Sequence, residues 1–174
     1  AAAYGPHAYA ALAAGAEEAS LCRHAQIVVG ASRSVTDDIC WRHGINPART
    51  RVITHFADLD LEEAPEIERS NNALVAVGTL TPSRGLLTVI QAVARLPEHM
   101  RAAVNLEIIG EGPQRDQLSR TAAELGVSLS LPGRLPHAEV IQRLRTCAVF
   151  IHASPLKRQS RSVLEALACG CAAV

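Results

Sequence analysis

The pattern that decides the fold is ALVAVGTLTPSRGLLTVIQAVARLPEHMRAAVNLEIIG, residues 73–110. An apolar run at 73–78 ends in glycine, a helical pattern follows at 86–96, and a second apolar run occupies 106–110. Short apolar runs bounded by turn residues are typical of buried strands, and the segment between them has the length and period of a helix. This stretch therefore predicts a strand, a helix and a second strand parallel to the first.

The same alternation continues towards the end of the chain. The sequence predicts further helices at 113–125, 137–145 and 160–169, further strands at 127–131 and 149–153, and a strand-like apolar run at 171–174. A strand followed by a helix and a parallel strand forms a right-handed unit, and successive units build one sheet with helices on both faces. We therefore expect an α/β, Rossmann-like fold with a parallel sheet.

The first 60 residues have the pattern of the tail of a separate unit. They predict helices at 8–23 and 34–43 and strands at 26–31 and 51–54. Gly44 is expected to end the second helix, and Trp41 to pack on it. The acidic, turn-rich segment 61–72 predicts a linker, which leaves 73–174 as a second domain. Since the chain begins without Met and stops within an apolar run, we expect it to be part of a longer protein.

Composition argues against several classes of function. The chain carries 17 basic and 17 acidic residues, and aromatic side chains make up 3% of it, so it lacks the basic surface and stacking rings of a nucleic-acid binder. None of its apolar runs reaches the ~20 residues of a membrane helix, which leaves peripheral membrane contact open. Five cysteines without framework spacing predict reduced thiols in the cytoplasm. Cys169 and Cys171 lack the further ligands that a zinc site needs, so we expect no metal.

Two strand-to-helix loops have features that suit a phosphate group. The first, residues 78–85, has a glycine at each end and Arg84 just before a helix, so it can aim backbone N–H groups and a guanidinium at phosphate oxygens. An ordinary loop with a solvated arginine has the same spacing. The second, residues 110–113, is a tight Gly-Glu-Gly-Pro turn that allows a backbone to approach a ligand closely. It lacks the G-x-G-x-x-G pattern of dinucleotide-binding enzymes, which disfavours a dehydrogenase.

A third loop leads into the last helix and to Glu165. It contains Lys157, Arg158 and Arg161 beside a helix N-terminus, whose dipole also favours anions. In open α/β sheets ligands bind at the carboxyl ends of the strands, and Glu165 is the first candidate site residue there. Ser162 and Glu165 also have the spacing of a capping box, in which two side chains satisfy backbone donors at a helix start. The spacing alone favours the capping box.

Five motifs, taken together, resemble the C-terminal domain of retaining GT-B glycosyltransferases. In chain order they are GTLTPSRG at 78–85, IIGEGPQRDQL at 108–118, PG at 132–133, CAVFIHAS at 147–154 and VLEALACG at 163–170. Two earlier motifs, VVGAS at 28–32 and RVITHFAD at 51–58, resemble the end of the N-terminal domain and the crossover of the same family. The resemblance implies two facing Rossmann-like domains, with 1–60 as the tail of the acceptor-side domain and 73–174 as a truncated nucleotide-sugar-binding domain.

The resemblance also implies an activity. A hexosyltransferase-type enzyme would move a sugar from a nucleotide-sugar donor to a carbohydrate or other hydroxyl acceptor, with retention and without metal or other cofactor. Carried over by position, Arg84 would contact the donor diphosphate, and Glu165, the second carboxylate of the E-x7-E motif, would contact the nucleotide ribose. These two are the implied catalytic residues. Gly78 and Gly110 would line the donor cleft, and Ser154 matches a small residue before the motif.

Two positions depart from the family pattern. Thr79 stands where the family usually has arginine, and Lys157 stands where the first carboxylate of the motif falls. That acid contacts the donor sugar in the family, so the alternatives include a nucleotide-binding module that has lost catalysis and a sugar-nucleotide epimerase of similar fold. Charge on a leaving diphosphate would be met by Arg84, with Lys157 or Arg161 and backbone N–H groups near Ser162 as further donors. Without most of the acceptor-side domain, we expect this chain alone to be inactive.

Overall fold

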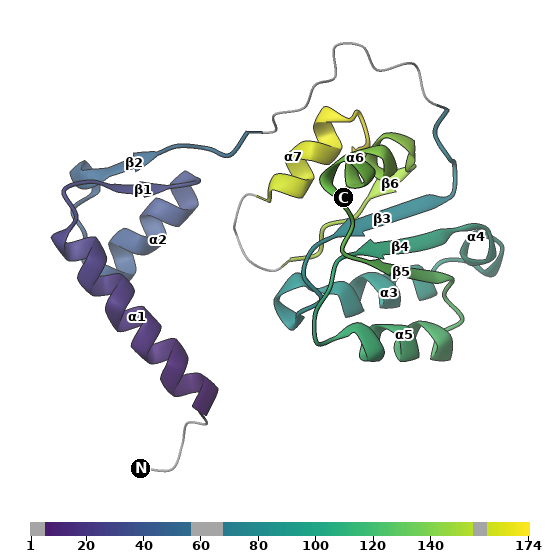
Figure 1. The fold of residues 1–174 in the computed structure, drawn as a ribbon, viewed down its shortest axis with the longest axis horizontal. Coiled ribbons are helices and arrows are strands. Elements are labelled where there is room, and N and C mark those ends of the chain that lie inside the picture. Colours follow the sequence, from purple (N-terminus) through teal and green to yellow (C-terminus); the bar gives the residue numbers. More distant parts are fainter. Residues whose placement is uncertain (1–5, 57–67, 155–159) are drawn as a thin grey trace. The chain divides into compact units, whose positions relative to one another are not determined.

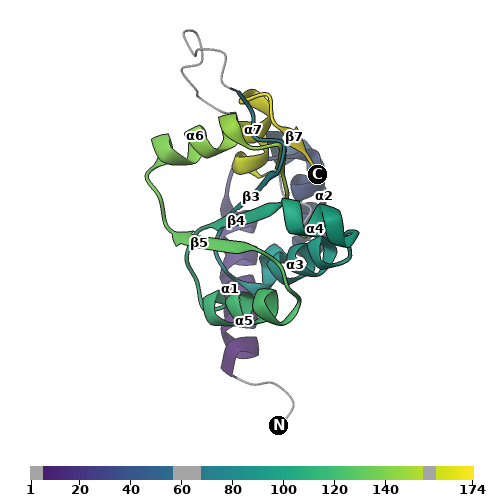
Figure 2. The ribbon, with the colours of Figure 1, turned by 90° about the vertical axis from the view of Figure 1, so that its right-hand side faces the viewer.

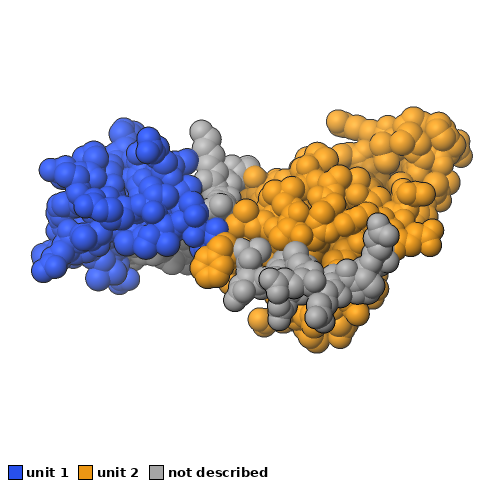
Figure 3. All heavy atoms as spheres, turned by 90° about the horizontal axis from the view of Figure 1, so that it is seen from above, with its two compact units in different colours: residues 1–55, 157–159 blue, residues 56–156, 160–174 orange. Residues whose placement is uncertain are grey.

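The computed structural model describes residues 6–56, 68–154 and 160–174. Most of the predicted linker, 61–67, and the loop residues 155–159, with Lys157 and Arg158, lie outside the described residues. The described chain forms two compact units, which Figure 3 shows in different colours. The first unit ends at His55.

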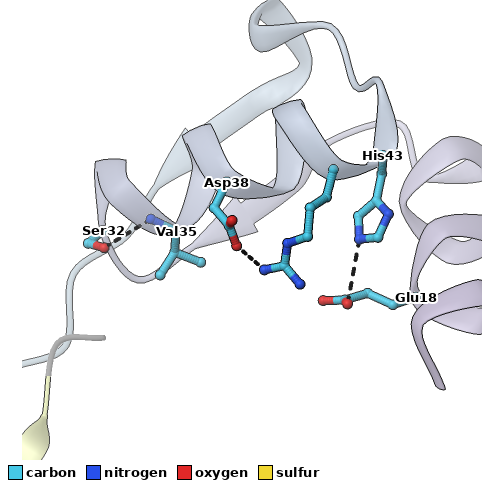
Figure 4. Close-up of polar contacts among 6 residues, drawn as sticks. Glu18, Ser32, Val35, Asp38 and His43 are labelled. Carbon is cyan, nitrogen blue, oxygen red and sulfur yellow. Dashed lines mark hydrogen bonds and ion pairs between the residues drawn. The ribbon is translucent and has the colours of Figure 1, made fainter. Parts of the chain in front are cut away.

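The first unit is built from two helices and a two-stranded parallel sheet (Figure 1). Its elements are α1 (Pro6–His24), β1 (Val28–Gly30), α2 (Arg33–His43), a 3-10 turn (Pro47–Arg49) and β2 (Thr50–Val52). Local chemistry sets both ends of α2. The Ser32 hydroxyl accepts a hydrogen bond from the Val35 N–H at 3.3 Å, and Gly44 ends the helix in the left-handed conformation at φ 65°, which confirms that prediction. His43 Nε2 lies 3.5 Å from Glu18 Oε2, so a side-chain pair joins α2 to α1 (Figure 4).

Trp41 does not pack on its own helix, so that prediction was wrong. The residue is 84% exposed. The residue that α2 buries is Thr36, whose methyl group lies against Gly30 of β1. Trp41 lies five residues after Thr36, and each residue of an α-helix turns by about 100° around the axis. Trp41 is therefore roughly 140° around the helix from Thr36, and the indole lies away from the face that meets the strands. Helical geometry, rather than the apolar character of the side chain, selects the buried face.

The second unit is a five-stranded parallel sheet with helices on both sides. Its elements are β3 (Ala73–Val77), a 3-10 turn (Pro82–Arg84), α3 (Leu86–Ala94), α4 (Glu98–Ala103), β4 (Asn105–Ile109), α5 (Arg115–Glu124), β5 (Leu129–Gly133), α6 (His137–Thr146), β6 (Val149–Phe150), α7 (Arg161–Ala168) and β7 (Ala172–Ala173). The strand order is β5-β4-β3-β6-β7, and every neighbouring pair is parallel. The predicted α/β, Rossmann-like fold is confirmed.

Helices lie on both faces of this sheet (Figure 1 and Figure 2). Each face has its own core. Helices α3 and α5 cover one face, where Ile90 and Leu118 pack against Leu106 and the strands around it. Helices α6 and α7 cover the other, where Leu144 packs with Phe150. The strand period of two explains the division, because successive side chains of β4 point to opposite faces. Truncating one of these buried leucines to alanine typically costs about 2–5 kcal/mol.

Two differences from the predicted elements have local causes. Helix α4 is missing from the prediction because Pro97 ends the preceding helical pattern and also occupies the N-cap position of α4. Strand β5 begins two residues later than predicted, at Leu129 rather than 127. Val127, whose apolar side chain extended the predicted strand, is buried in the first core before the strand starts. Among the described helices, none combines the length and the hydropathy that a membrane span requires.

Candidate functional site

The strand order creates a topological switch point at the carboxyl ends of β3 and β6. From β3 the chain moves outward through β4 to β5, and it then returns to β6 and moves outward in the other direction to β7. The loops that follow β3 and β6 therefore lead away from one another while their strands remain neighbours. In open α/β sheets this crevice is where ligands bind. The loop at 78–85 and the segment 151–154 both start here.

The loop after β3 is fixed by hydrogen bonds to both neighbouring loops. The Leu80 N–H donates to the Glu111 carbonyl at 2.8 Å, and the Gln114 N–H donates to the Leu80 carbonyl at 3.0 Å. Leu80 itself is fully buried. On the other side, the Ser154 hydroxyl donates to the Ser83 carbonyl at 3.0 Å. The loop that contains Arg84 is therefore held rigidly between the strand ends.

The two glycines of the second loop serve this packing. A Cβ on Gly110 would collide with the Gly78 carbonyl oxygen, and one on Gly112 would lie 2.5 Å from the Leu80 carbonyl oxygen. The backbone approach that this turn permits is thus, in the structure, an approach to the first loop. Gly110 remains beside Gly78 at the candidate site.

Arg84 lies at the carboxyl end of β3, beside two of the residues predicted to share its site, Gly78 and Thr79. Its Cδ and Nε would lie 3.6 Å from a Cβ on Gly78, and its Nε donates to the Thr79 hydroxyl at 3.4 Å. The Thr79 hydroxyl also lies 3.5 Å from that of Thr81, which lies 3.1 Å from that of Ser83. A guanidinium and a row of hydroxyls therefore stand together at the switch point. This combination of donors suits a phosphate-bearing ligand.

His152 belongs to the same region, although the sequence analysis does not single it out. Burial lowers the pKa of His152, and the positive charge of Arg84 lowers it further. Both surroundings therefore favour the neutral imidazole over the charged one. In the sequence, such a residue can be recognised as a titratable side chain two positions after a buried strand at the switch point.

Glu165 lies on α7 and does not belong to a capping box. Helix α7 begins at Arg161 after Ser160, so Ser162 is already inside the helix. The Ser162 hydroxyl lies 2.8 Å from that of Ser160, and Glu165 Oε1 lies 3.2 Å from His137 Nε2. The capping-box interpretation, which the spacing favours, was therefore wrong. It fails because the helix starts at Arg161, two residues earlier than a cap at Ser162 requires.

The predicted site residues fall into two groups. Gly78, Thr79, Arg84, Gly110 and Ser154 are joined through the loops at the switch point, as the contacts above describe. The other group, Ser162 and Glu165 with exposed Arg161, lies on α7. Within the described ranges, no hydrogen bond or ion pair joins Glu165 to Arg84.

The structure also has a cavity at the opposite edge of the sheet. Its volume is about 320 Å³, and it is lined by Asn105, Ser128 and Thr146 at the amino ends of β4 and β5 and the end of α6. Glu107 and Arg143, 3.4 Å apart, close one side. Because ligand sites of parallel sheets lie at the carboxyl ends, this cavity is separate from the candidate site. In the parts of the chain that the structure describes, no three metal-ligating side chains come together.

Comparison with known proteins gives a family and several relatives. A family model described as Glycosyl transferases group 1 matches residues 59–174. An N-acetylgalactosamine-N,N'-diacetylbacillosaminyl-diphospho-undecaprenol 4-alpha-N-acetylgalactosaminyltransferase of Campylobacter jejuni is 24% identical over 86% of this chain and 41% of its own length. The lipopolysaccharide core biosynthesis glycosyltransferase LpsE of Rhizobium meliloti is 29% identical over 76% of this chain and 38% of its own length. The chain thus spans about two fifths of these relatives.

A solved structure shows the same fold. The crystal structure of HepE from Anabaena in complex with UDP and glucose superposes with a TM-score of 0.75 at 21% identity. The superposition covers 88% of this chain and 45% of HepE.

Proposed function

Because this chain belongs to the group 1 glycosyl transferases, which have the GT-B fold, we propose that it forms the donor-binding part of a metal-independent hexosyltransferase. The complete enzyme would transfer a sugar from a nucleotide-sugar donor to a hydroxyl acceptor with retention at the anomeric carbon. We assign 73–174 to the donor-binding domain, 1–60 to the tail of the acceptor-side domain and 61–72 to the linker between them. In this assignment the 174-residue chain binds the donor and does not by itself catalyse transfer.

The observation that carries the proposal is the fixed position of Arg84 at the switch point. Departure of a nucleoside diphosphate leaves negative charge, which preorganised donors in a site of this kind stabilise. Arg84 is held beside the Thr79 hydroxyl by a loop that hydrogen-bonds to both neighbours. In this assignment Arg84 binds the diphosphate, while Gly78 and Gly110 line the donor cleft.

The remaining roles follow from the family resemblance. Glu165 binds the ribose of the donor, and Ser154 lies beside the Arg84 loop. Arg161 and Lys157 add positive charge near the diphosphate, and backbone N–H groups near Ser162 add donors.

The names of the relatives bear on the acceptor. The Campylobacter relative acts on a diphospho-undecaprenol-linked sugar, and the Rhizobium relative takes part in lipopolysaccharide core synthesis. We extend this to a lipid-linked carbohydrate acceptor for the present protein. That assignment places the enzyme in the cytoplasm with peripheral contact to the membrane that holds its acceptor.

Thermal unfolding of this chain with UDP, GDP and ADP tests the donor site. A diphosphate at about one hundred times its dissociation constant stabilises by about 2.7 kcal/mol, which raises the melting temperature by several degrees at this size. We expect one of the three to stabilise selectively, and Arg84→Ala to abolish the shift. The matched control is Arg120→Ala, an exposed arginine on α5. Equal shifts in the parent chain and Arg84→Ala would contradict the role of Arg84.

A second function is favoured by the two departures from the family pattern. With Thr79 in place of arginine and Lys157 in place of an acid, the cleft can bind a nucleotide sugar and lack catalysis. Assays of donor binding and turnover with the complete protein distinguish the transferase from the inactive module. Donor turnover supports the transferase, and donor binding without turnover supports the inactive module.

A further inference from the structure

Glu165 has a partner on a different helix. Its Oε1 lies 3.2 Å from Nε2 of His137, which is the first residue of α6. The Glu165 side chain is 17% exposed, and that of His137 is 62% exposed. Among the residues that the structure describes, His137 is the one side chain that hydrogen-bonds to Glu165.

The fold holds this pair in register. Helix α6 begins directly after the loop at the carboxyl end of β5, which places His137 at the edge of the sheet where ligands bind. Behind the pair, Val140 and Leu144 of α6 and Ala166 of α7 are buried in one core. The two helices therefore keep the imidazole and the carboxylate opposite one another without help from a ligand.

The contact provides a hydrogen-bond donor for one of the two carboxylate oxygens of Glu165. A carboxylate has two oxygens, each able to accept hydrogen bonds, and burying it without donors is costly. His137 occupies Oε1, so Oε2 is the oxygen that remains for a ligand. A carboxylate already oriented by one donor loses less side-chain freedom when it binds the next.

We propose that His137 is a positioning residue of the donor site: its imidazole donates to Glu165 Oε1 and so orients Oε2 to accept from the ribose hydroxyls of a nucleoside diphosphate. This inference rests on the proposed function. It assigns to α6 a part in donor binding, and it makes nucleotide affinity depend on a side chain that does not touch the nucleotide itself.

Titration calorimetry on this chain tests the inference with matched nucleotides. UDP, GDP or ADP, whichever stabilises the chain most, is compared with its 2′,3′-dideoxy counterpart. His137→Ala should weaken binding of the ribonucleotide about tenfold, the effect expected for losing a hydrogen bond to a charged group. Its effect on the dideoxy nucleotide, which lacks the hydroxyls that Glu165 would bind, should be close to none.

Three further variants separate positioning from folding. His137→Gln keeps a donor and should bind the ribonucleotide within about threefold of the parent chain. In a Glu165→Gln background, His137→Ala should have no additional effect, because the carboxylate that it orients is gone. Arg120→Ala is the control for unrelated surface changes, and melting temperatures confirm that each variant folds.

The outcomes separate this inference from the function on which it rests. Equal loss of affinity for the ribonucleotide and the dideoxy nucleotide in His137→Ala overturns the positioning role and leaves the donor site intact. Unchanged affinity of His137→Ala for the ribonucleotide also overturns the positioning role and leaves the donor site intact. A folded chain that binds none of the diphosphates overturns the proposed function, and the role of His137 with it.

Discussion

The α-carbon of Gly110 faces the carbonyl oxygen of Gly78 so closely that no side chain fits between them. The contact joins the ends of β4 and β3, and the Gly78 N–H donates to the Ile109 carbonyl at 3.0 Å in the same place. Gly110 has φ 149°, in the half of backbone space that residues with side chains rarely adopt. Collision and backbone strain therefore act together at this position.

Gly110→Ala should destabilise the second unit by about 2–4 kcal/mol, because the strand ends must separate to admit the methyl group. Urea unfolding measures the change. Gly126→Ala is the matched control: Gly126 has φ 63° and no atom within 4 Å of a Cβ, so it tests backbone strain alone. The control should lose about 1 kcal/mol. Equal losses in the two variants would show that the contact with Gly78 contributes nothing.

The thiols of Cys147 and Cys171 lie 2.9 Å apart in the core beneath α6 and α7. Burial, and then the hydrogen bond with Cys171, raises the pKa of Cys147 to about 12. Burial also raises the pKa of Cys169. Since the thiolate is the form that attacks thiol reagents, these buried side chains should be inert in the folded protein.

A disulfide reagent at about pH 8 should therefore label the two partly exposed cysteines, Cys22 and Cys40, and no others until urea is added. Quantifying the released chromophore gives the count. Cys147→Ser should leave the fast phase unchanged, whereas Cys22→Ser should remove one equivalent. Fast reaction of a third thiol in the folded chain would refute the inertness of the core cysteines.

Arg69 connects three segments that lie far apart in the sequence. Its guanidinium donates to the Cys169 carbonyl at 2.5 Å and to the Cys147 carbonyl at 3.5 Å. The adjacent Ser70 N–H donates to the Thr146 carbonyl at 2.8 Å. The segment before β3 is thereby fastened to the ends of α6 and α7.

Arg69→Ala should cost about 1–2 kcal/mol of unfolding free energy, because two carbonyl oxygens lose a charged donor. Arg95→Ala, at an exposed position beside α3, should change the free energy by less than about 0.5 kcal/mol. Urea denaturation of the three proteins makes the comparison. If the Arg69 variant is as stable as the Arg95 variant, the hydrogen bonds of Arg69 do not contribute to stability.

The fold could be predicted from the sequence because its signals are local. Each strand of the second unit is a short apolar run, and each helix has its own period, so the order of elements follows without tertiary information. Trp41 marks the limit of that reasoning. Its apolar character predicts burial, but its position on α2 relative to Thr36 leaves it exposed.

The candidate site could be predicted only in part because its contacts are not local. Glu165 is identifiable as a carboxylate near a sheet edge, whereas its partner His137 stands 28 positions earlier in the chain. The capping-box spacing at Ser162 is the same whether or not the helix begins there. The start of α7 at Arg161 excludes Ser162 as the N-cap residue. The sequence pattern alone does not fix a helix boundary to one residue.

His152 links the stability of the fold to the charge of the candidate site. Its pKa is lowered in the folded chain, first by burial and then by Arg84. A histidine whose folded pKa lies below its unfolded value of 6.5 stabilises the fold above that pH, and the contribution is lost as the pH falls, because the unfolded chain takes up the proton more readily. Unfolding free energy should therefore decrease on acidification below about pH 6.5.

Urea unfolding at a series of pH values on either side of that point provides the test. His152→Leu should flatten the decrease, because the titrating group is removed. Arg84→Gln should reduce it in part, since one of the two causes is gone and burial remains, while Arg120→Gln should leave the parent profile unchanged. A bound nucleoside diphosphate should act like Arg84→Gln by neutralising the guanidinium, so that its binding takes up protons in this pH range. A profile that is the same in the parent chain and in His152→Leu would assign the acid sensitivity to other groups.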